Sequence, residues 1–253
     1  MNSMKRLAIA VFGSSLLAFG VSSNAQTTAD LVAGALAHSD RPAADAADDA
    51  RRMPLEVLAF AGLQAGMTVF ELEAGGGYYT EIISRAVGSA GSVVMHNPPA
   101  FDSFLGDQIP ARVAGNRLPN VTISRTNFDV LEAADNSVDM VTWILGPHEL
   151  GFAPGGQSLG DADAAFSEIA RILKPGGLFL AIDHIAAPGT GLDVGGTLHR
   201  IREELVTEHA EAAGMSVLRN SNLHKNESDP LDNSVFDDSI AGRTSKFVVL
   251  YRK

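Results

Sequence analysis

Val69-Phe-Glu-Leu-Glu-Ala-Gly-Gly-Gly-Tyr-Tyr-Thr80 is the stretch that decides the fold predicted for this sequence. It runs from a short apolar segment through a glycine turn into the start of a helix. Gly75 and Gly77 let the backbone turn tightly and let a ligand approach without interference from a Cβ atom. The helix start behind them offers free N–H groups to a polar or anionic group. A dinucleotide fingerprint has a third glycine where this chain has Thr80, so the loop favours a ligand without a pyrophosphate.

Short apolar runs and amphipathic segments alternate on both sides of this loop. Buried strands are predicted at Thr68–Leu72, Ser92–Met95, Val121–Ser124, Val138–Ile144, Leu178–Ile182, Ser216–Leu218 and Lys246–Tyr251. Helices are predicted at Pro54–Gly62, Tyr79–Val87, Ala162–Leu173 and Thr197–Ala213. Loops are expected at Gly151–Asp163, a candidate lid, and at Asn222–Thr244. The order predicts an α/β fold with a doubly wound, seven-stranded, mostly parallel sheet covered on both sides.

The first 25 residues have the features of a secretory signal peptide. Lys5-Arg6 precede a short apolar run, and Ser23-Asn24-Ala25 ends in small residues. The alternative is an uncleaved N-terminal anchor. We predict a signal peptide at residues 1–25, an N-terminal helical extension at 26–53 and one domain at 54–253. Export to the periplasm follows, with no stable membrane insertion after cleavage.

Composition excludes several classes of function. Of the 253 residues, 45% are hydrophobic, which is enough for a core, and the net charge is −11. An acidic chain without a basic patch is not expected to bind nucleic acid. Because there is no cysteine, disulfides, thiolate metal sites and cysteine nucleophiles are excluded. The acidic runs Asp45–Asp49 and Asp229–Asp238 are interpreted as solvated surface.

Polar side chains follow five of the predicted strands. They are Glu71, Glu73, His96, Asn97, Asn127, Asp129, His148, Glu149, Asp183 and His184. Because ligands of open parallel sheets sit beyond the carboxyl ends of the strands, these residues predict a ligand cleft. Three of them, His148, Glu149 and His184, are candidates for acid–base work, and His199 is a fourth. The histidines and carboxylates are also suited to a divalent metal, but no His-x-x-x-His spacing supports one and we predict none.

Three motifs in this order resemble the class I (Rossmann-like) S-adenosylmethionine-dependent methyltransferases. They are the glycine loop, the acidic turn and strand Asp135-Asn-Ser-Val-Asp139-Met-Val, and the turn and strand Ile169-Ala-Arg-Ile-Leu-Lys-Pro-Gly-Gly-Leu-Phe-Leu180. The resemblance covers roughly residues 54–253. It implies S-adenosylmethionine as cofactor and a small molecule as methyl acceptor.

The resemblance also implies which residues hold the cofactor. Those expected to do so are Glu71, Glu73, Gly75, Gly77, Tyr78, Asn97 and, on the adenine side, Asp129. Two of them depart from the pattern. Glu73 stands where the class has glycine, with its carboxylate facing the ligand's ammonium or narrowing the pocket. Asn97 replaces the acidic residue for the ribose hydroxyls, so we expect cofactor binding that is weaker or altered in specificity.

Further pieces are similar to those of an exported subset of the class. They are Gly77–Glu81, His148-Glu149, Asp183-His184 and His199-Arg200-Ile201. Two alternatives remain open at this point. One is a non-catalytic protein that binds a small ligand on the same fold, and the other is a metal-assisted enzyme that uses the histidine cluster. The acceptor and the oligomeric state are not predicted.

Overall fold

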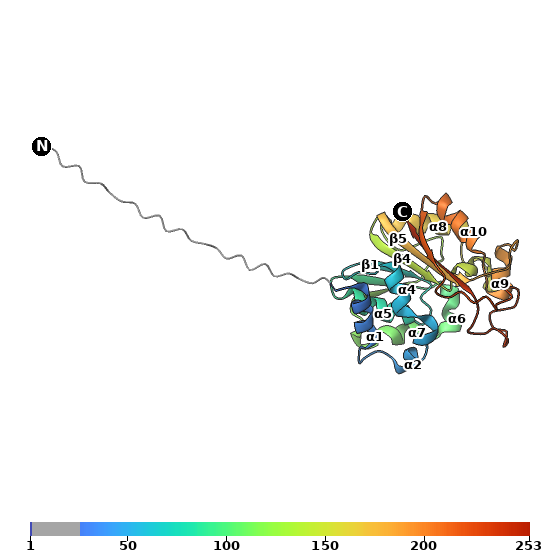
Figure 1. Ribbon diagram of the computed structural model, residues 1–253, viewed down its shortest axis with the longest axis horizontal. Helices are drawn as coiled ribbons and strands as arrows, with labels where there is room; N and C mark the ends of the chain where they lie inside the picture. Colours follow the sequence, from blue (N-terminus) through green and yellow to red (C-terminus); the bar gives the residue numbers. More distant parts are fainter. Residues whose placement is uncertain (2–25) are drawn as a thin grey trace.

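A seven-stranded sheet forms the centre of the computed structural model, which describes Met1 and residues 26–253 (Figure 1). The strands are β1 (Thr68–Leu72), β2 (Ser92–His96), β3 (Val121–Ser124), β4 (Val138–Ile144), β5 (Leu173–His184), β6 (Ser216–Ser221) and β7 (Lys246–Arg252). Their order is β3-β2-β1-β4-β5-β7-β6, with β7 antiparallel to both of its neighbours and the other pairs parallel. This confirms the predicted fold class. Residues 2–25 of the predicted signal peptide lie outside the described residues.

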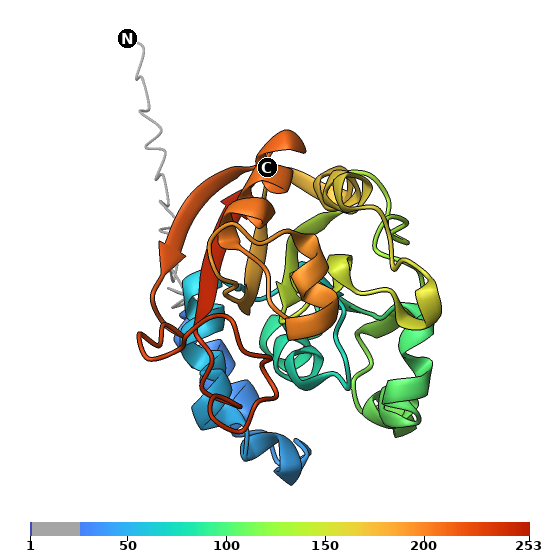
Figure 2. The ribbon, with the colours of Figure 1, turned by 90° about the vertical axis from the view of Figure 1, so that its right-hand side faces the viewer.

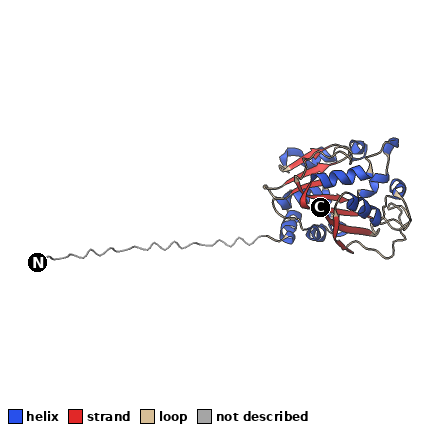
Figure 3. Cartoon of the chain, turned by 90° about the horizontal axis from the view of Figure 1, so that it is seen from above, coloured by secondary structure: helices blue, strands red, loops and turns tan. Residues whose placement is uncertain are grey.

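Helices cover both faces of the sheet (Figures 1, 2 and 3). One face is covered by α1 (Thr28–Leu36), α4 (Pro54–Ala61) and α5 (Tyr78–Val87), and the other by α8 (Ala162–Ile172) and α10 (Glu203–Ala212). Because side chains alternate along a strand, Val69 of β1 packs with the first group and Phe70 with the second. In the described part of the chain, no helix has the length and apolar character needed to cross a bilayer.

Shorter helices connect the larger elements. These are α2 (Ala43–Ala46), α3 (Asp49–Arg52), α6 (Asp102–Leu105), α7 (Gln108–Val113) and α9 (Gly195–Leu198). Single 3₁₀ turns lie at Pro99–Phe101, Ala114–Asn116, Pro147–Gly151, Pro154–Gly156 and Leu192–Val194. The turn Pro147–Gly151 follows β4 directly, and the chain therefore reverses at the carboxyl edge of the sheet.

The predicted helix over residues 197–213 is wrong. The chain leaves the helical path at His199, whose φ is +53°, and α10 begins only at Glu203. Between the two helices, Ile201 N donates to His184 O over 2.9 Å, and Ala186 N donates to Ile201 O over 3.1 Å. Pairing with the chain after β5 therefore prevails over a helical periodicity that is otherwise continuous.

Both acidic runs are partly internal, so their interpretation as solvated surface is wrong for three residues. Asp45 pairs with Arg112 over 2.6 Å, and Asp49 accepts a 2.7 Å hydrogen bond from Arg41. Asp229 is buried and is held at 2.9 and 3.0 Å by the guanidinium of Arg200. The Asp45 pair fixes the N-terminal extension to α7, and the Asp229 pair fixes the 222–244 loop to the segment between α9 and α10.

Candidate functional site

The glycine loop joins β1 to α5 at the carboxyl edge of the sheet. Gly75 and Gly77 have φ values of +57° and +81°, a region that residues with a Cβ atom rarely adopt. At Gly77 a Cβ atom would also lie 2.9 Å from both Arg112 Cγ and the terminal methyl of Met95. Gly75 is therefore required by backbone conformation, and Gly77 by conformation and close packing together.

Asn97 holds the glycine loop through two hydrogen bonds to Gly75. Its Oδ1 accepts from Gly75 N over 2.8 Å, and its Nδ2 donates to Gly75 O over 3.1 Å. Asn97 is fully buried, and both ends of its amide are engaged by one residue. A contact between Asn97 and a ribose would require this pair of bonds to open, so the ribose role stays a prediction.

A cleft of about 390 Å³ lies over the glycine loop, within the size range of small-molecule sites. It is lined by Ala44, Asp45, Asp48, Arg52, Glu73, Ala74, Gly75, Gly76, Tyr78, Gln108, Arg112, Ile144 and Leu145. The predicted cofactor residues Glu73, Gly75 and Tyr78 thus share one space. The helices α2 and α3 of the N-terminal extension form the opposite wall of the cleft. The sequence did not predict this role, because the acidic composition of the segment indicated solvated surface.

The motif Tyr78-Tyr79-Thr80-Glu81 holds that wall in place. Tyr78 Oη donates to Asp49 over 2.6 Å, and Tyr79 Oη donates to the carbonyl oxygen of Arg52 over 3.0 Å. Glu81 is fully buried and accepts from three arginines, Arg85, Arg112 and Arg117. The first turn of α5 therefore supports the cleft through tyrosine hydroxyls and a buried carboxylate.

Thr80 and Glu71 form a buried pair under the loop. The Thr80 hydroxyl donates to the Glu71 carboxyl, and both residues are almost without solvent exposure. Burial raises the pKa of Glu71 to about 8, because the charged form loses its hydration. Glu71 does not line the cleft, and its proximity to the glycine loop makes it a support for that loop.

Glu73 adopts a backbone conformation typical of the glycine it replaces. Its φ is +54°, and its Oε2 accepts a 3.0 Å hydrogen bond from Trp143 Nε1. The carboxylate lies against Gly146, where a Cβ atom would stand 2.2 Å from Oε2. Burial, and then the charge of Glu149, raise the pKa of Glu73 well above its usual range. Glu73 therefore connects the cleft electrostatically to the residues that follow β4.

His148 and Asp183 form the centre of that neighbouring group. His148 lies in the turn after β4, and Asp183 lies near the end of β5. The Asp183 carboxylate accepts from His148 N over 2.7 Å and lies 2.9 Å from His148 Nδ1. Burial alone would lower the pKa of His148, but the carboxylates of Asp183 and Glu149 outweigh it and raise the pKa to about 10.

Glu149 and His199 complete the group on the other side of the His148 ring. His148 Nε2 lies 3.2 Å from Glu149 Oε1 and 3.2 Å from His199 Nδ1, and these last two atoms are 3.8 Å apart. Glu149 Oε2 is buried and has no hydrogen-bond partner among the residues that the structure describes. The structure thus brings together His148, Glu149 and His199, which are three of the four predicted acid–base residues. These three and Asp183, which contacts His148 Nδ1, are called the histidine cluster below.

Two glycines allow this approach. A Cβ atom on Gly195 would lie 2.0 Å from His148 O, and one on Gly151 would lie 1.7 Å from Leu192 O. The turn after β4 and the start of α9 therefore touch backbone to backbone, which places His199 beside His148. Sequence reasoning missed both glycines, because a contact between turns more than forty positions apart leaves no local pattern.

The remaining predicted residues lie elsewhere. His184 Nδ1 is 2.7 Å from Thr244 Oγ1, and burial lowers the pKa of His184 to about 3. His96 is fully buried, with Nε2 2.9 Å from the carbonyl oxygen of Thr126. Asp129 and Asn127 line a separate cleft of about 460 Å³ and do not line the space over the glycine loop. The structure does not join Asp129 to the other predicted cofactor residues.

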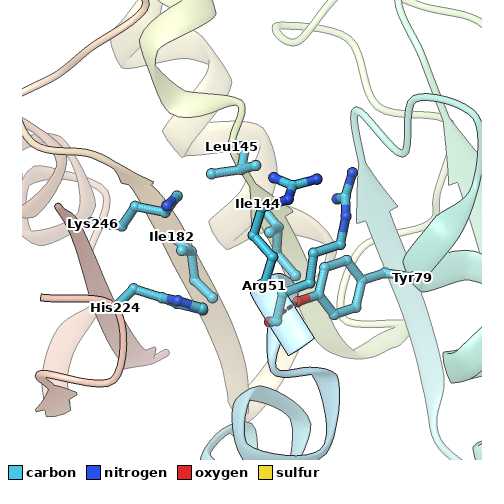
Figure 4. A pocket seen from close by; sticks show the side chains of 8 residues that line it. Arg51, Tyr79, Ile144, Leu145, Ile182, His224 and Lys246 are labelled. Carbon is cyan, nitrogen blue, oxygen red and sulfur yellow. Dashed lines mark hydrogen bonds between the residues drawn. The ribbon is translucent and has the colours of Figure 1, made fainter. Parts of the chain in front are cut away.

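A small cationic cavity adjoins the cleft (Figure 4). Its volume is about 20 Å³, and it is lined by Arg51, Arg52, Tyr79, Ile144, Leu145, Ile182, His224 and Lys246. Lys246 is only 9% exposed and donates to Thr244 O, and burial lowers its pKa to about 8. Arg52, Ile144 and Leu145 line both spaces, so an anionic end of a ligand in the cleft would meet cations here.

Comparison with known proteins agrees with this architecture. Residues 71–181 match the model of a family described as a methyltransferase domain. The ubiquinone/menaquinone biosynthesis C-methyltransferase UbiE of Shewanella halifaxensis is 30% identical over 165 residues, which cover 63% of this chain and 61% of that protein. The same enzyme of Hahella chejuensis is 31% identical over 48% of this chain and 45% of its own. The aligned part is thus less than two thirds of either relative.

Solved structures share the fold at low sequence identity. An S-adenosylmethionine-dependent methyltransferase of Aquifex aeolicus aligns with a TM-score of 0.58 and 21% identity, over 81% of this chain and 92% of that one. The [4+2]-cyclase SpnF aligns with a TM-score of 0.59 and 17% identity, over 90% and 97% of the two chains. In its matched domain, its sequence relatives and its sheet topology, this chain is similar to S-adenosylmethionine-dependent methyltransferases.

Proposed function

We propose that this chain transfers a methyl group from S-adenosylmethionine to a small-molecule acceptor. The observation that carries the proposal is the adjacency of two spaces, the cleft over the glycine loop and the histidine cluster. Glu73 lines the cleft, and its Oε2 lies against Gly146, two residues before His148. A donor in the cleft and an acceptor at the cluster would therefore meet at the ends of β1 and β4.

The residues of the cleft fit the amino-acid half of the cofactor. Gly75 and Gly76 line the cleft without side chains and leave room for a ligand over the loop. The guanidinium of Arg52, at the junction with the cationic cavity, suits a carboxylate. Asp48 and Glu73 offer carboxylates to an ammonium group. When bound, the cofactor supplies a methyl group that its sulfonium already activates. The task of the protein is then alignment of donor and acceptor.

The histidine cluster suits an acceptor atom that loses a proton. Asp183 fixes the His148 ring so that Nε2 faces Glu149 and His199. Burial lowers the pKa of His199, and this uncharged ring can receive the proton of a hydroxyl or amine. His199 packs against Phe152 and Phe236, with ring centroids 5.9 and 4.9 Å away, and Phe236 is 69% exposed. These rings favour an acceptor with a flat, apolar body, such as an aromatic hydroxyl compound.

We also propose that the chain belongs to an exported subset of the class and is active in the periplasm. The support is the sequence of its first 25 residues, with Lys5-Arg6 before an apolar run and small residues before Gln26. Cell fractionation tests this, with N-terminal sequencing of the recovered protein. A new N-terminus at Gln26 in the periplasmic fraction is expected, and an intact N-terminus in the cytoplasmic fraction would contradict export.

Calorimetric titration of the full chain with S-adenosylmethionine, and separately with S-adenosylhomocysteine, tests the enzyme proposal. We expect saturable one-site binding that Gly77→Val reduces, because its side chain would meet Arg112 and Met95. Gly34→Ala is the matched control, since a Cβ atom there meets open space on α1. No binding at millimolar ligand, with the chain folded by circular dichroism, would contradict the proposal.

A further inference from the structure

The histidine cluster has a geometry that hydrogen bonding does not fully explain. His148 Nδ1 faces Asp183, and in a neutral ring this nitrogen carries the proton. His148 Nε2 then presents a lone pair, yet it faces both Glu149 Oε1 and His199 Nδ1 at 3.2 Å. A single proton on Nε2 would have to be divided between these two contacts in a three-centre bond. Three Lewis bases therefore converge on one point.

The spacing of the three atoms matches a four-coordinate metal. With metal–ligand bonds of about 2.0–2.2 Å, neighbouring ligands of a tetrahedral site lie roughly 3.3–3.6 Å apart, and those of an octahedral site roughly 2.8–3.1 Å. The observed separations are 3.2, 3.2 and 3.8 Å, which are nearer to the tetrahedral range. The three atoms also lie within 4.8 Å of one another, as one face of a coordination polyhedron requires.

The charge and the burial of the histidine cluster also favour a bound metal ion. The carboxylates of Glu149 and Asp183 are 8% and 0% exposed by residue, and Glu73 lies close to both. Among the described residues, no lysine or arginine forms an ion pair with Glu149 or Asp183. Glu149 Oε2 is buried and unpartnered as well. A buried group of carboxylates around two imidazoles is stabilised by a dication, which also supplies a partner for the free oxygen.

We propose that His148 Nε2, Glu149 and His199 Nδ1 bind one Zn²⁺ ion. Asp183 orients His148 through Nδ1, as carboxylates commonly orient a metal-bound histidine. The fourth position stays open toward the side on which His199 is 25% exposed. This deepens the proposed function, on which its role in the reaction rests. The acceptor hydroxyl would bind the metal at the open position, its pKa would fall, and its proton would pass to water on that side before the oxygen takes the methyl group from the sulfonium.

Metal binding is measured without any cofactor, so it is read separately from the proposed function. The full chain, without an affinity tag, is stripped with a chelator, dialysed and titrated with Zn²⁺ by calorimetry, and its metal content is measured by mass spectrometry. We expect one Zn²⁺ per chain. Loading with Co²⁺ instead is expected to give the visible absorption bands of a tetrahedral cobalt centre.

Variants identify the ligands. His199→Asn removes one ligand but suits the position, because asparagine tolerates the left-handed conformation that His199 adopts. This variant and Glu149→Gln should each weaken Zn²⁺ binding by about 100-fold or more, and Asp183→Asn by about 10–100-fold. His38→Ala removes an exposed imidazole on the N-terminal extension and should leave affinity unchanged within about twofold.

The outcomes separate the two proposals. If the wild-type chain binds Zn²⁺ no more tightly than His199→Asn, or if His38→Ala causes the same loss, the metal site is refuted and the cluster is a hydrogen-bonded acid–base group. Circular dichroism of each variant shows whether a loss of binding comes from unfolding, and His199→Asn with Glu149→Gln gives two independent readings. Zn²⁺ binding without binding of S-adenosylmethionine would support the site and contradict the methyl-transfer proposal.

Discussion

The carboxylate of Asp183 holds His148 at two points, accepting from its backbone N over 2.7 Å and lying 2.9 Å from its Nδ1. A residue of β5 thereby sets both the path of the turn after β4 and the orientation of the imidazole within that turn. Asp183 is fully buried, so neither contact is shared with solvent. The position of β5 therefore determines where the histidine cluster lies.

Asp183→Asn should destabilise the chain by about 3 kcal/mol, because it leaves a buried imidazole without its charged partner. The measurement is urea denaturation at neutral pH. Asp163→Asn is a matched control, since it breaks another His–Asp pair, 2.8 Å long, in which Asp163 is 80% exposed. That change should cost less than about 1 kcal/mol. Equal losses in the two variants would show that the buried pair has no special role.

Gly195→Ala tests how the cluster is assembled. The added methyl group would stand 2.0 Å from His148 O, so the turn after β4 and α9 must separate. We expect a loss of about 2 kcal/mol or more in the free energy of unfolding. The nuclear magnetic resonance signals of the His199 ring should shift as well. Gly34→Ala, in open space on α1, should instead be neutral or stabilise by about 1 kcal/mol. A folded Gly195→Ala variant with unchanged His199 signals would contradict this account.

Local patterns predict the sheet and most of its strands, because buried parallel strands are short apolar runs bounded by turns. The strands Thr68–Leu72, Val121–Ser124 and Val138–Ile144 have the predicted bounds. The strand predicted at Leu178–Ile182 is longer in the structure and begins at Leu173. Backbone pairing extends it, and pairing of this kind is not encoded in apolar periodicity.

The candidate site was only partly predictable. The polar residues after β4 and β5 could be found because ligands gather at the carboxyl edge of such sheets. The interruption at His199 was not found, since a run of amphipathic residues hides a break that tertiary pairing imposes. The anchoring of Asp45 and Asp49 also depends on partners far along the chain, Arg112 and Tyr78, and composition alone cannot identify them.

Tyr78→Phe should loosen the N-terminal extension. It removes the 2.6 Å hydrogen bond to Asp49, and with it about 1–3 kcal/mol of local stability, because the acceptor is charged. Limited proteolysis should then cut faster between Ala37 and Met53, in the wall of the cleft. Tyr251→Phe is the matched control, because it removes a 2.9 Å hydrogen bond to Thr207, and neither of these residues lines the cleft. Faster cleavage in both variants would indicate a general loss of stability.

Glu71→Gln should change how stability depends on pH. Burial raises the pKa of Glu71 from its usual 4.5 to about 8, so between these values the folded protein retains a proton that the unfolded chain releases. Stability from this group is therefore fully present below about pH 4.5 and is lost as the pH rises through about 8. The slope is at most about 1.4 kcal/mol per pH unit. Glutamine imitates the protonated carboxyl and keeps an acceptor for the Thr80 hydroxyl.

The variant is therefore expected to be more stable than the wild type at pH 8 and nearly equal to it at pH 5, as measured by urea denaturation at both values. Glu168→Gln is the opposite control. Arg171 lowers the pKa of Glu168 through a 2.6 Å hydrogen bond, so replacing Glu168 removes stability that is present above its usual pKa. If Glu71→Gln loses stability at pH 8 as Glu168→Gln does, then Glu71 is charged in the folded protein. The support under the glycine loop would in that case be an ionised group.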